Sequence, residues 1–209
     1  MAKPEKYFQN LYDLAAILNS ARSPDQILQA IVENVTKAMN ARGCSLMLLT
    51  PDKSVLIHTA AYGLSDWFVR KGPVSADKSM SESLKGKIVS VLNAAADDRI
   101  EYQKQAKQEG IASILSVPVK LRGEVVGVMR VYTSNPHRFG RSEISFAEAA
   151  ANFGAIALEK THYYGTLQAD YEMLKLDLRQ QRAEVGYEEG AEPPVVLTQE
   201  KGPVAPPGG

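Results

Sequence analysis

The fold is decided by residues 115–132, which read LSVPVKLRGEVVGVMRVY. Two apolar runs rich in β-branched residues flank a short Arg-Gly-Glu turn, a pattern typical of an antiparallel hairpin. Gly127, inside the second run, has no side chain, so another part of the protein can lie close to its backbone. From Ser142 the pattern is helical and stays so for about forty residues. A hairpin followed by a long helix is therefore predicted for the C-terminal half.

The N-terminal half is predicted to begin with two helices, the first over residues 4–19. The second begins after Ser23, because a serine N-cap, Pro24 at the first helical position and a Gln26 side chain able to bond back form a capping box. Strands are predicted at residues 44–50, 55–62 and 88–92, a short helix at 79–84 and a polar helix at 101–109.

Composition excludes several classes of protein. Basic and acidic side chains balance at 24 each, so no overall field attracts nucleic acid or an anionic membrane. The apolar runs are too short to span a bilayer, the first residues lack a signal-peptide core, and Ala2 stands where N-myristoylation needs glycine. The single cysteine, Cys44, fits a reducing compartment. A cytoplasmic protein without nucleic-acid or membrane partners is expected.

Short motifs follow one another along residues 24–163 in a recognisable order. They are AAYGL at 60–64, NAAADDR at 93–99, SVPV at 116–119, GVMRV at 127–131 and RF at 138–139. In order and spacing they resemble the GAF domain, a small-molecule-sensing module of signalling proteins. The resemblance implies an α+β fold (an α/β sandwich) with an antiparallel sheet of five or six strands. Long helices would cover one face, and shorter helices and loops would close a ligand pocket on the other.

The chain is expected to divide into four segments. They are an N-terminal amphipathic helix at 1–22, the GAF domain at 23–163, a C-terminal helical extension at 164–185 and a disordered tail at 186–209. The tail is rich in proline, glycine and glutamate and cannot bury enough apolar surface to fold.

The resemblance places a pocket between the sheet and residues 63–84 and 93–109. The ligand-binding candidates are Trp67, Phe68, Ser81, Asp97, Asp98, Tyr102, Ser116 and Arg130. Buried aromatics at 67 and 68 fit either a pocket wall or plain core, and Asp98 fits either the pocket or a helix cap. Arg130 interrupts an apolar strand; it either meets a carboxylate or phosphate in the pocket, or faces solvent or an ion-pair partner. One residue of slip in the hairpin would exchange these two orientations.

Specialised branches of the family match poorly. Bilin-binding members hold their chromophore through a pocket cysteine, whereas Cys44 lies in the first predicted strand, where a small buried hydrophobe is expected. Relatives that reduce methionine sulfoxide need several reactive cysteines. Asn135, Phe139 and Glu143 match parts of the signature of cyclic-nucleotide-binding members, without its lysine and aspartate.

Catalysis and bound cofactors are not indicated. No nucleophile, base and orienting group share a recognisable spacing, so a non-enzymatic protein is expected. Three separated histidines and one cysteine make no metal-ligand cluster, and no cofactor is evident, although a small-molecule ligand of unknown identity is compatible with the pocket. A haem ligand among the histidines, and with it a redox or haem sensor, stays as a further alternative.

The expected function is a sensor of the kind found in bacterial regulators, which passes its signal to a separate partner protein. The rival is a scaffold or assembly protein with a vestigial pocket. A homodimer through the terminal helices is also expected, because apolar residues repeat at spacings of three and four. The predicted interface consists of Tyr7, Leu11, Leu14, Leu18, Tyr163, Leu167, Tyr171, Leu174 and Leu178.

Overall fold

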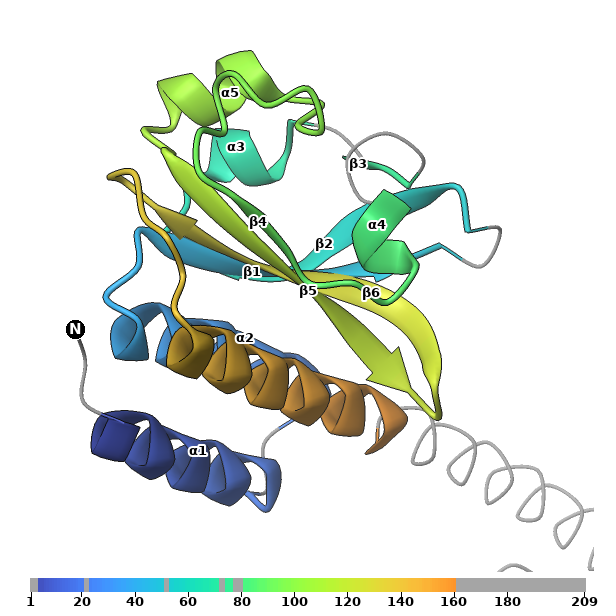
Figure 1. Ribbon diagram of the computed structural model, residues 1–209. Coiled ribbons are helices and arrows are strands. Elements are labelled where there is room, and N and C mark those ends of the chain that lie inside the picture. Colours follow the sequence, from blue (N-terminus) through green and yellow to red (C-terminus); the bar gives the residue numbers. More distant parts are fainter. Residues whose placement is uncertain (1–3, 21–22, 51–52, 72–73, 77–80, 161–209) are drawn as a thin grey trace, which may run out of the picture. The chain divides into compact units, whose positions relative to one another are not determined.

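The computed structural model describes residues 4–20, 23–50, 53–71, 74–76 and 81–160 (Figure 1). The predicted helical extension 164–185 and the tail 186–209 lie outside the described residues. The same holds for the C-terminal part of the predicted dimer interface, which is Tyr163, Leu167, Tyr171, Leu174 and Leu178.

Six antiparallel strands form one sheet in the order β3-β2-β1-β6-β5-β4. Their bounds are β1 Gly43–Leu49, β2 Val55–Tyr62, β3 Val74–Ser75, β4 Val89–Val91, β5 Ser113–Leu121 and β6 Glu124–Thr133. The predicted antiparallel sheet of five or six strands is therefore confirmed. The short strand β3, which extends the β2 edge, was not expected from the sequence.

The predicted hairpin is the pair β5–β6, where Leu121 pairs with Glu124 across a two-residue turn. The turn residues Arg122 and Gly123 have φ of 51° and 87°, as a type I′ turn requires at both central positions. A Cβ added at Gly127 would lie 2.3 Å from the carbonyl oxygen of Met47 in β1. The expected close approach at this glycine is confirmed, and the neighbouring strand makes it.

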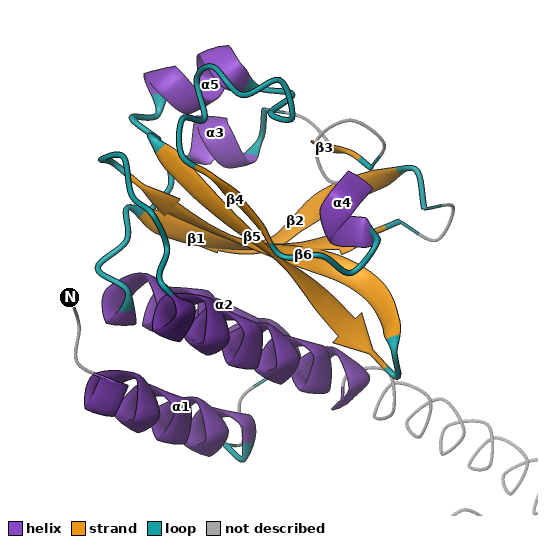
Figure 2. Ribbon diagram, in the orientation of Figure 1, coloured by secondary structure: helices purple, strands orange, loops and turns teal. Residues whose placement is uncertain are grey.

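The two faces of the sheet are covered by helices of different length (Figure 2). One face carries α2 (Pro24–Ala38), the outer helix α1 (Pro4–Leu18) and a C-terminal helix at residues 141–160. The opposite face carries the short helices α3 (Asp66–Val69), α4 (Ser81–Leu84) and α5 (Gln103–Gln108). This is the predicted α+β sandwich, with long helices on one side only.

The predicted start of α2 is confirmed in detail. The amide of Ser23 donates to Gln26 Oε1 at 3.0 Å, and the amide of Gln26 donates to Ser23 Oγ at 3.4 Å. Two amides that the first turn leaves without backbone partners are thereby satisfied. The helix then buries an apolar side formed by Ile27, Leu28, Ile31, Val32 and Val35.

The C-terminal helix lies close to the sheet because its inner side is made of small residues. These are Ala147, Ala150, Ala151, Gly154 and Ala155, all buried. A Cβ on Gly154 would lie 2.9 Å from Leu46 Cδ1. Ile156 of the same helix is 50% exposed.

The four residues of α1 in the predicted dimer interface pack against the core of the chain itself. Tyr7 stacks on Phe146 with ring centroids 4.8 Å apart, and Leu14 is fully buried. Leu11 and Leu18 are partly buried against the same core. Tyr7 and Leu14 are thus buried within the chain itself, so the apolar spacing of this helix does not by itself require a second chain. On α1 the exposed large apolar side chains are Phe8 and Tyr12, at 77% and 67%.

Candidate functional site

A row of polar side chains crosses the sheet on the face away from the long helices. Ser45 in β1, Arg130 in β6 and Ser116 in β5 are directly opposite one another in the strand register, and all are buried. Because side chains alternate along a strand, their neighbours Cys44, Leu115 and Val131 point to the helix-covered core.

This polar row borders a small cavity between the sheet and the segments around α3 and α5. Its volume is about 10 Å³, close to the smallest space that holds one water molecule. The sheet contributes His58, Arg130 and Tyr132 to its wall. The covering segments contribute Phe68, Lys71 and Tyr102.

Arg130 is turned inward and is only 6% exposed, so the solvent-facing orientation is wrong. Its Nε donates to Ser116 Oγ at 3.0 Å. Burial lowers the pKa of Arg130, and the adjacent Tyr132 opposes this shift. The Tyr132 hydroxyl lies 3.0 Å from Ser45 Oγ, so the polar row and the tyrosine form one network.

Lys71 lies on the covering side of the cavity, after α3. Its Nζ donates to the carbonyl oxygen of Phe68 at 2.9 Å and lies 3.3 Å from His58 Nε2. The same ammonium lies 3.9 Å from the centroid of the Phe68 ring, a cation–π contact. Burial, together with the charge of Arg130, lowers the pKa of Lys71 to about 8, so the side chain is charged at neutral pH.

His58 is the third basic residue at the cavity. Burial, followed by the charges of Lys71 and Arg130, lowers its pKa to about 4, so the ring is neutral at pH 7. Its position depends on a bulge in the β1–β2 pairing at Leu46/Met47. Leu56 and His58 lie on the cavity side of the sheet, whereas Ala60 joins the helix-covered core.

Glu109, directly after α5, is a buried carboxylate that links the segments covering the cavity to the start of the sheet. It accepts hydrogen bonds from the backbone amide of Ser65 at 2.9 Å and from the Ser65 hydroxyl. It also pairs with Arg42 at 3.1 Å, and Arg42 donates to the carbonyl oxygen of Gly63 at 2.6 Å. The starts of α3 and β1 and the end of α5 are thus joined by one side chain.

The family of the chain follows from sequence and fold together. A family model described as GAF domain matches residues 21–159. The chain belongs to the GAF domain family. The comparison with curated proteins finds no match.

Solved structures share this GAF fold. The GAF domain of a phosphoenolpyruvate-protein phosphotransferase from Coxiella burnetii is 18% identical, with a TM-score of 0.71, covering 78% of this chain and 99% of that one. A domain from Sinorhizobium meliloti, provisionally described as part of a two-component sensor histidine kinase, is 21% identical with a TM-score of 0.61, covering 71% and 99%. The free methionine-R-sulfoxide reductase of Neisseria meningitidis is 15% identical with a TM-score of 0.63, covering 76% and 91%.

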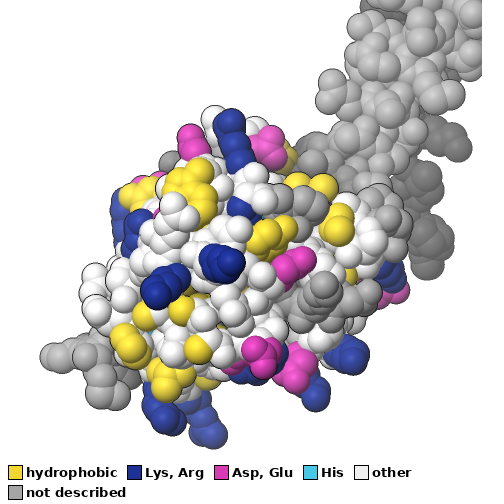
Figure 3. All heavy atoms as spheres, turned by 90° about the horizontal axis from the view of Figure 1, so that it is seen from above, with side chains coloured by type: hydrophobic (Ala, Val, Ile, Leu, Met, Phe, Trp, Pro, Cys, Tyr) yellow, Lys and Arg dark blue, Asp and Glu magenta, His cyan; other side chains and the backbone are white. Residues whose placement is uncertain are grey.

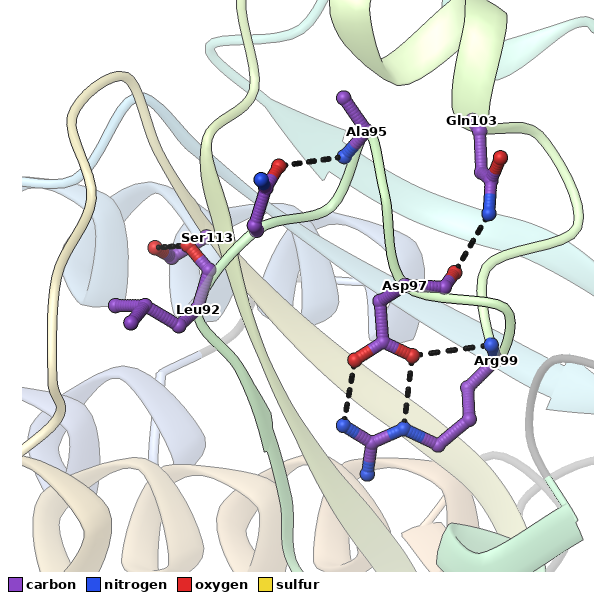
Figure 4. A network of polar contacts seen from close by, with 7 residues as sticks. Leu92, Ala95, Asp97, Arg99, Gln103 and Ser113 are labelled. Atoms are coloured by element: carbon purple, nitrogen blue, oxygen red, sulfur yellow. Dashed lines mark hydrogen bonds and ion pairs between the residues drawn. The ribbon is translucent and has the colours of Figure 1, made fainter.

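The loop at residues 93–99, which the family resemblance placed at the pocket, is organised by its own contacts (Figure 4). Both carboxylate oxygens of Asp97 hold the Arg99 guanidinium, at 2.9 and 2.7 Å. The Asp97 carbonyl accepts from Gln103 Nε2 at 2.8 Å, which fixes the loop to the start of α5. The hydrogen bond from Arg99 holds the pKa of Asp97 below its usual value. Asp97 therefore shapes the loop, and Asp98 is exposed.

The GAF pocket brings together only some of the predicted ligand-binding residues. Phe68, Tyr102 and Arg130 line the cavity, and Ser116 holds Arg130 in place. The remaining four, Trp67, Ser81, Asp97 and Asp98, do not line it. Trp67 is 43% exposed because the single turn of α3 points Phe68 inward and its neighbour outward. Figure 3, seen from above, shows lysines and arginines interspersed with apolar side chains on this side of the domain.

Three residues with polar side chains at the cavity were absent from the predicted set: His58, Lys71 and Tyr132. The alternation of β6 could have indicated Tyr132, since it shares a face with Arg130. The bulge that turns His58 inward has no signal in the sequence. Lys71 follows a helix of four residues that the pattern did not reveal.

The residues matching the cyclic-nucleotide signature lie elsewhere. Glu143 accepts from the amide of Gly140 at 2.7 Å and contacts His137 Nε2 at 2.9 Å. These contacts start the C-terminal helix. Together with Asn135 and Phe139, Glu143 borders an open hollow of about 430 Å³ beside the end of α2.

Cys44 is fully buried as expected, and burial raises the pKa of its thiol. Within the described ranges no group of three or more potential metal-ligating side chains occurs. Over the same residues no helix combines the length and apolarity needed to cross a membrane.

Proposed function

We propose that this chain is a small-molecule-sensing regulatory domain that acts in signal transduction through protein–protein contacts, without catalytic output of its own. The observation that carries the proposal is the convergence of His58, Lys71 and Arg130 on one interior cavity. Burying positive charge is costly, and apolar side chains of similar volume would stabilise a core better. Three basic groups at one cavity therefore favour a role in binding a ligand over a role in packing the core.

Glu109 supplies a route from this pocket to the helical layer. A ligand that displaced α5 would act on Glu109 at its end, and through the ion pair on Arg42. Arg42 lies between the end of α2 and the start of β1, so the displacement would reach the long helices. Ligand binding would thus favour one arrangement of those helices over another.

The output surface is proposed to be the helical layer, in a cytoplasmic homodimer and towards a separate signalling partner. Phe8 and Tyr12, one turn apart on α1, are large apolar side chains that the helix leaves exposed to solvent. They replace Tyr7 and Leu14 as the contact expected from this helix, because those two are already covered within the chain.

Native mass spectrometry of the full chain, purified from its own host, tests the sensor proposal. A small molecule that is retained in the folded protein and lost on denaturation is expected, together with the mass of a dimer. The variant Phe8→Glu/Tyr12→Glu should become monomeric, whereas Gln9→Glu/Asp13→Asn, on exposed positions of the same helix, should stay dimeric. A protein that retains no small molecule and binds none from a host metabolite extract would refute the sensor function.

The scaffold function is a second candidate, because the described cavity has room for only about one water molecule. In a scaffold the domain would assemble with its partner whether or not a small molecule is present. Partner binding that is unchanged by removing every retained compound would favour this second function.

A further inference from the structure

Within the part of the chain that the structure describes, two of the three basic residues of the interior site, Lys71 and His58, lack a full set of hydrogen-bond acceptors. Lys71 is the clearest case. Its partners are the Phe68 carbonyl, His58 and two aromatic rings. Among the described residues no carboxylate lies within ion-pair distance of its ammonium. The carboxylates that act on it at longer range are those of Glu109 and Glu101. Both are engaged elsewhere, with Ser65 and with the amide of Ser75.

The contact between Lys71 and His58 determines which ring nitrogen carries a proton. A charged lysine has three donors and no acceptor, so His58 Nε2 has to accept. The neutral ring then carries its proton on Nδ1, which becomes a donor. Nδ1 is buried and has no hydrogen-bond partner among the described residues. A buried donor without an acceptor costs stability that an incoming acceptor would restore.

We propose that the site formed by Lys71, His58 and Arg130 binds the carboxylate group of a small organic acid. The inference rests on the proposed sensor function and specifies its ligand class. A carboxylate offers only acceptors, which suits the Lys71 ammonium and the Nδ1–H of His58. Its negative charge would also offset the mutual repulsion of Lys71 and Arg130.

A carboxylate fits better than a phosphate on grounds of size and charge. The cavity measures about 10 Å³, so a compact planar group needs the smaller displacement of the side chains around it. A phosphate group carries roughly −1.5 to −2 charge at pH 7 and three acceptor oxygens. Glu101 and Glu109 already act on Lys71, so the site has little surplus charge for a dianion. Lys71, whose ammonium lies over the Phe68 ring, has a flexible side chain and is the natural part to move.

Isothermal titration calorimetry on the full chain tests the inference. The probes are sodium formate, acetate and propionate at constant ionic strength, each compared with its neutral amide and with inorganic phosphate. At least one acid is expected to bind saturably while its amide does not. Lys71→Met keeps the length of the side chain and removes the charge, and should weaken binding about ten- to hundredfold. The control Lys104→Met, an exposed lysine of α5, should bind as the parent does.

A second readout uses no variant. In ¹⁵N spectra of the histidine rings, the Nδ1 signal of His58 should shift on adding the acid that binds, because a new hydrogen bond forms there. Equal binding of acid and amide, unchanged binding by Lys71→Met, or an unmoved Nδ1 signal would overturn the proposal. Binding of phosphate but of no carboxylate would overturn it as well.

The failure of this inference can be told apart from failure of the sensor function. If native mass spectrometry finds a retained neutral compound while the acids do not bind, the sensor function stands and the carboxylate inference fails. If the protein neither retains a compound nor binds any of the probes, both fail.

Discussion

The two faces of the sheet are built from the same strands but differ in what they bury. The helix-covered face is apolar: Leu115, Val117 and Val119 of β5 contact one continuous core. The opposite face carries two smaller apolar clusters and the polar row of Ser45, Arg130 and Ser116, which runs across the strands. Stability is therefore expected to depend mainly on the first face. The second face gives up some stability for groups that are suited to recognition.

The largest effect on stability is expected when a buried side chain on the helix-covered face is shortened. Leu115→Ala removes a fully buried side chain and should lower the free energy of unfolding by about 2–5 kcal/mol. Urea denaturation measures the loss. Ile57→Ala, at a side chain of β2 that is 54% exposed, is the control and should change stability by less than about 0.5 kcal/mol. Similar losses at the two positions would contradict the assignment of the core to this face.

Lowering the pH should lower the free energy of unfolding, because His58 is buried on the cavity side of the sheet. The pKa of His58 is about 4 when folded and 6.5 when unfolded. Between these values the unfolded chain binds more protons, so stability falls as pH falls. The loss at pH 5 should be about 2 kcal/mol relative to pH 7.5. Urea midpoints at the two pH values measure it.

His58→Gln is the matched variant for this pH dependence, since glutamine does not titrate. The variant should lose that part of the acid sensitivity, whereas His137→Gln, in the loop before the C-terminal helix, should keep it. Parallel pH profiles for the parent and His58→Gln would show that the ring does not stay neutral in the folded chain.

Weakening the contact of Glu109 with Arg42, which links the two sides of the sheet, is expected to have an intermediate effect on stability. Glu109→Gln removes the charge that pairs with Arg42 and weakens the acceptor for Ser65. Because Arg42 is partly exposed, the loss in stability should be about 1–3 kcal/mol rather than that of a fully buried pair. Hydrogen exchange should become faster at residues 65–69 and 103–109. The exposed Glu148→Gln serves as control, and equal behaviour of the two variants would remove Glu109 from the coupling route.

The smallest expected effect has the opposite sign. Lys71→Met replaces a buried ammonium by an apolar side chain of similar length and should raise the free energy of unfolding by about 1 kcal/mol. Thermal unfolding of the variant beside Lys104→Met measures the gain. A clear loss of stability would mean that Lys71 contributes to packing and is not held for a ligand.

The sequence predicted the architecture well because local signals and long-range order agree there. Ser23 and Gln26 form the capping box as predicted, and the turn at Arg122-Gly123 adopts the backbone that its residues favour. The helix-covered face could also be read from the alternation of Leu115, Val117 and Val119.

The cavity was less predictable because its members depend on irregular features. His58 reaches it through a bulge, and Lys71 follows a single turn of helix. Arg130 could have faced either way until the register was fixed by its pairing with Ser45 and Ser116. The position of Asp97 away from the cavity lining could not be predicted, because a loop aspartate serves a ligand site or its own loop with the same residue pattern.

Hydrogen–deuterium exchange of the full chain, with and without the small-molecule extract of its own host, tests most directly whether the polar face of the sheet binds a ligand. Slower exchange is expected at residues 65–71 and 103–109, the segments around α3 and α5 that cover the cavity. Unchanged exchange in these two segments, or protection confined to the long helices, would contradict a ligand site on the polar face of the sheet.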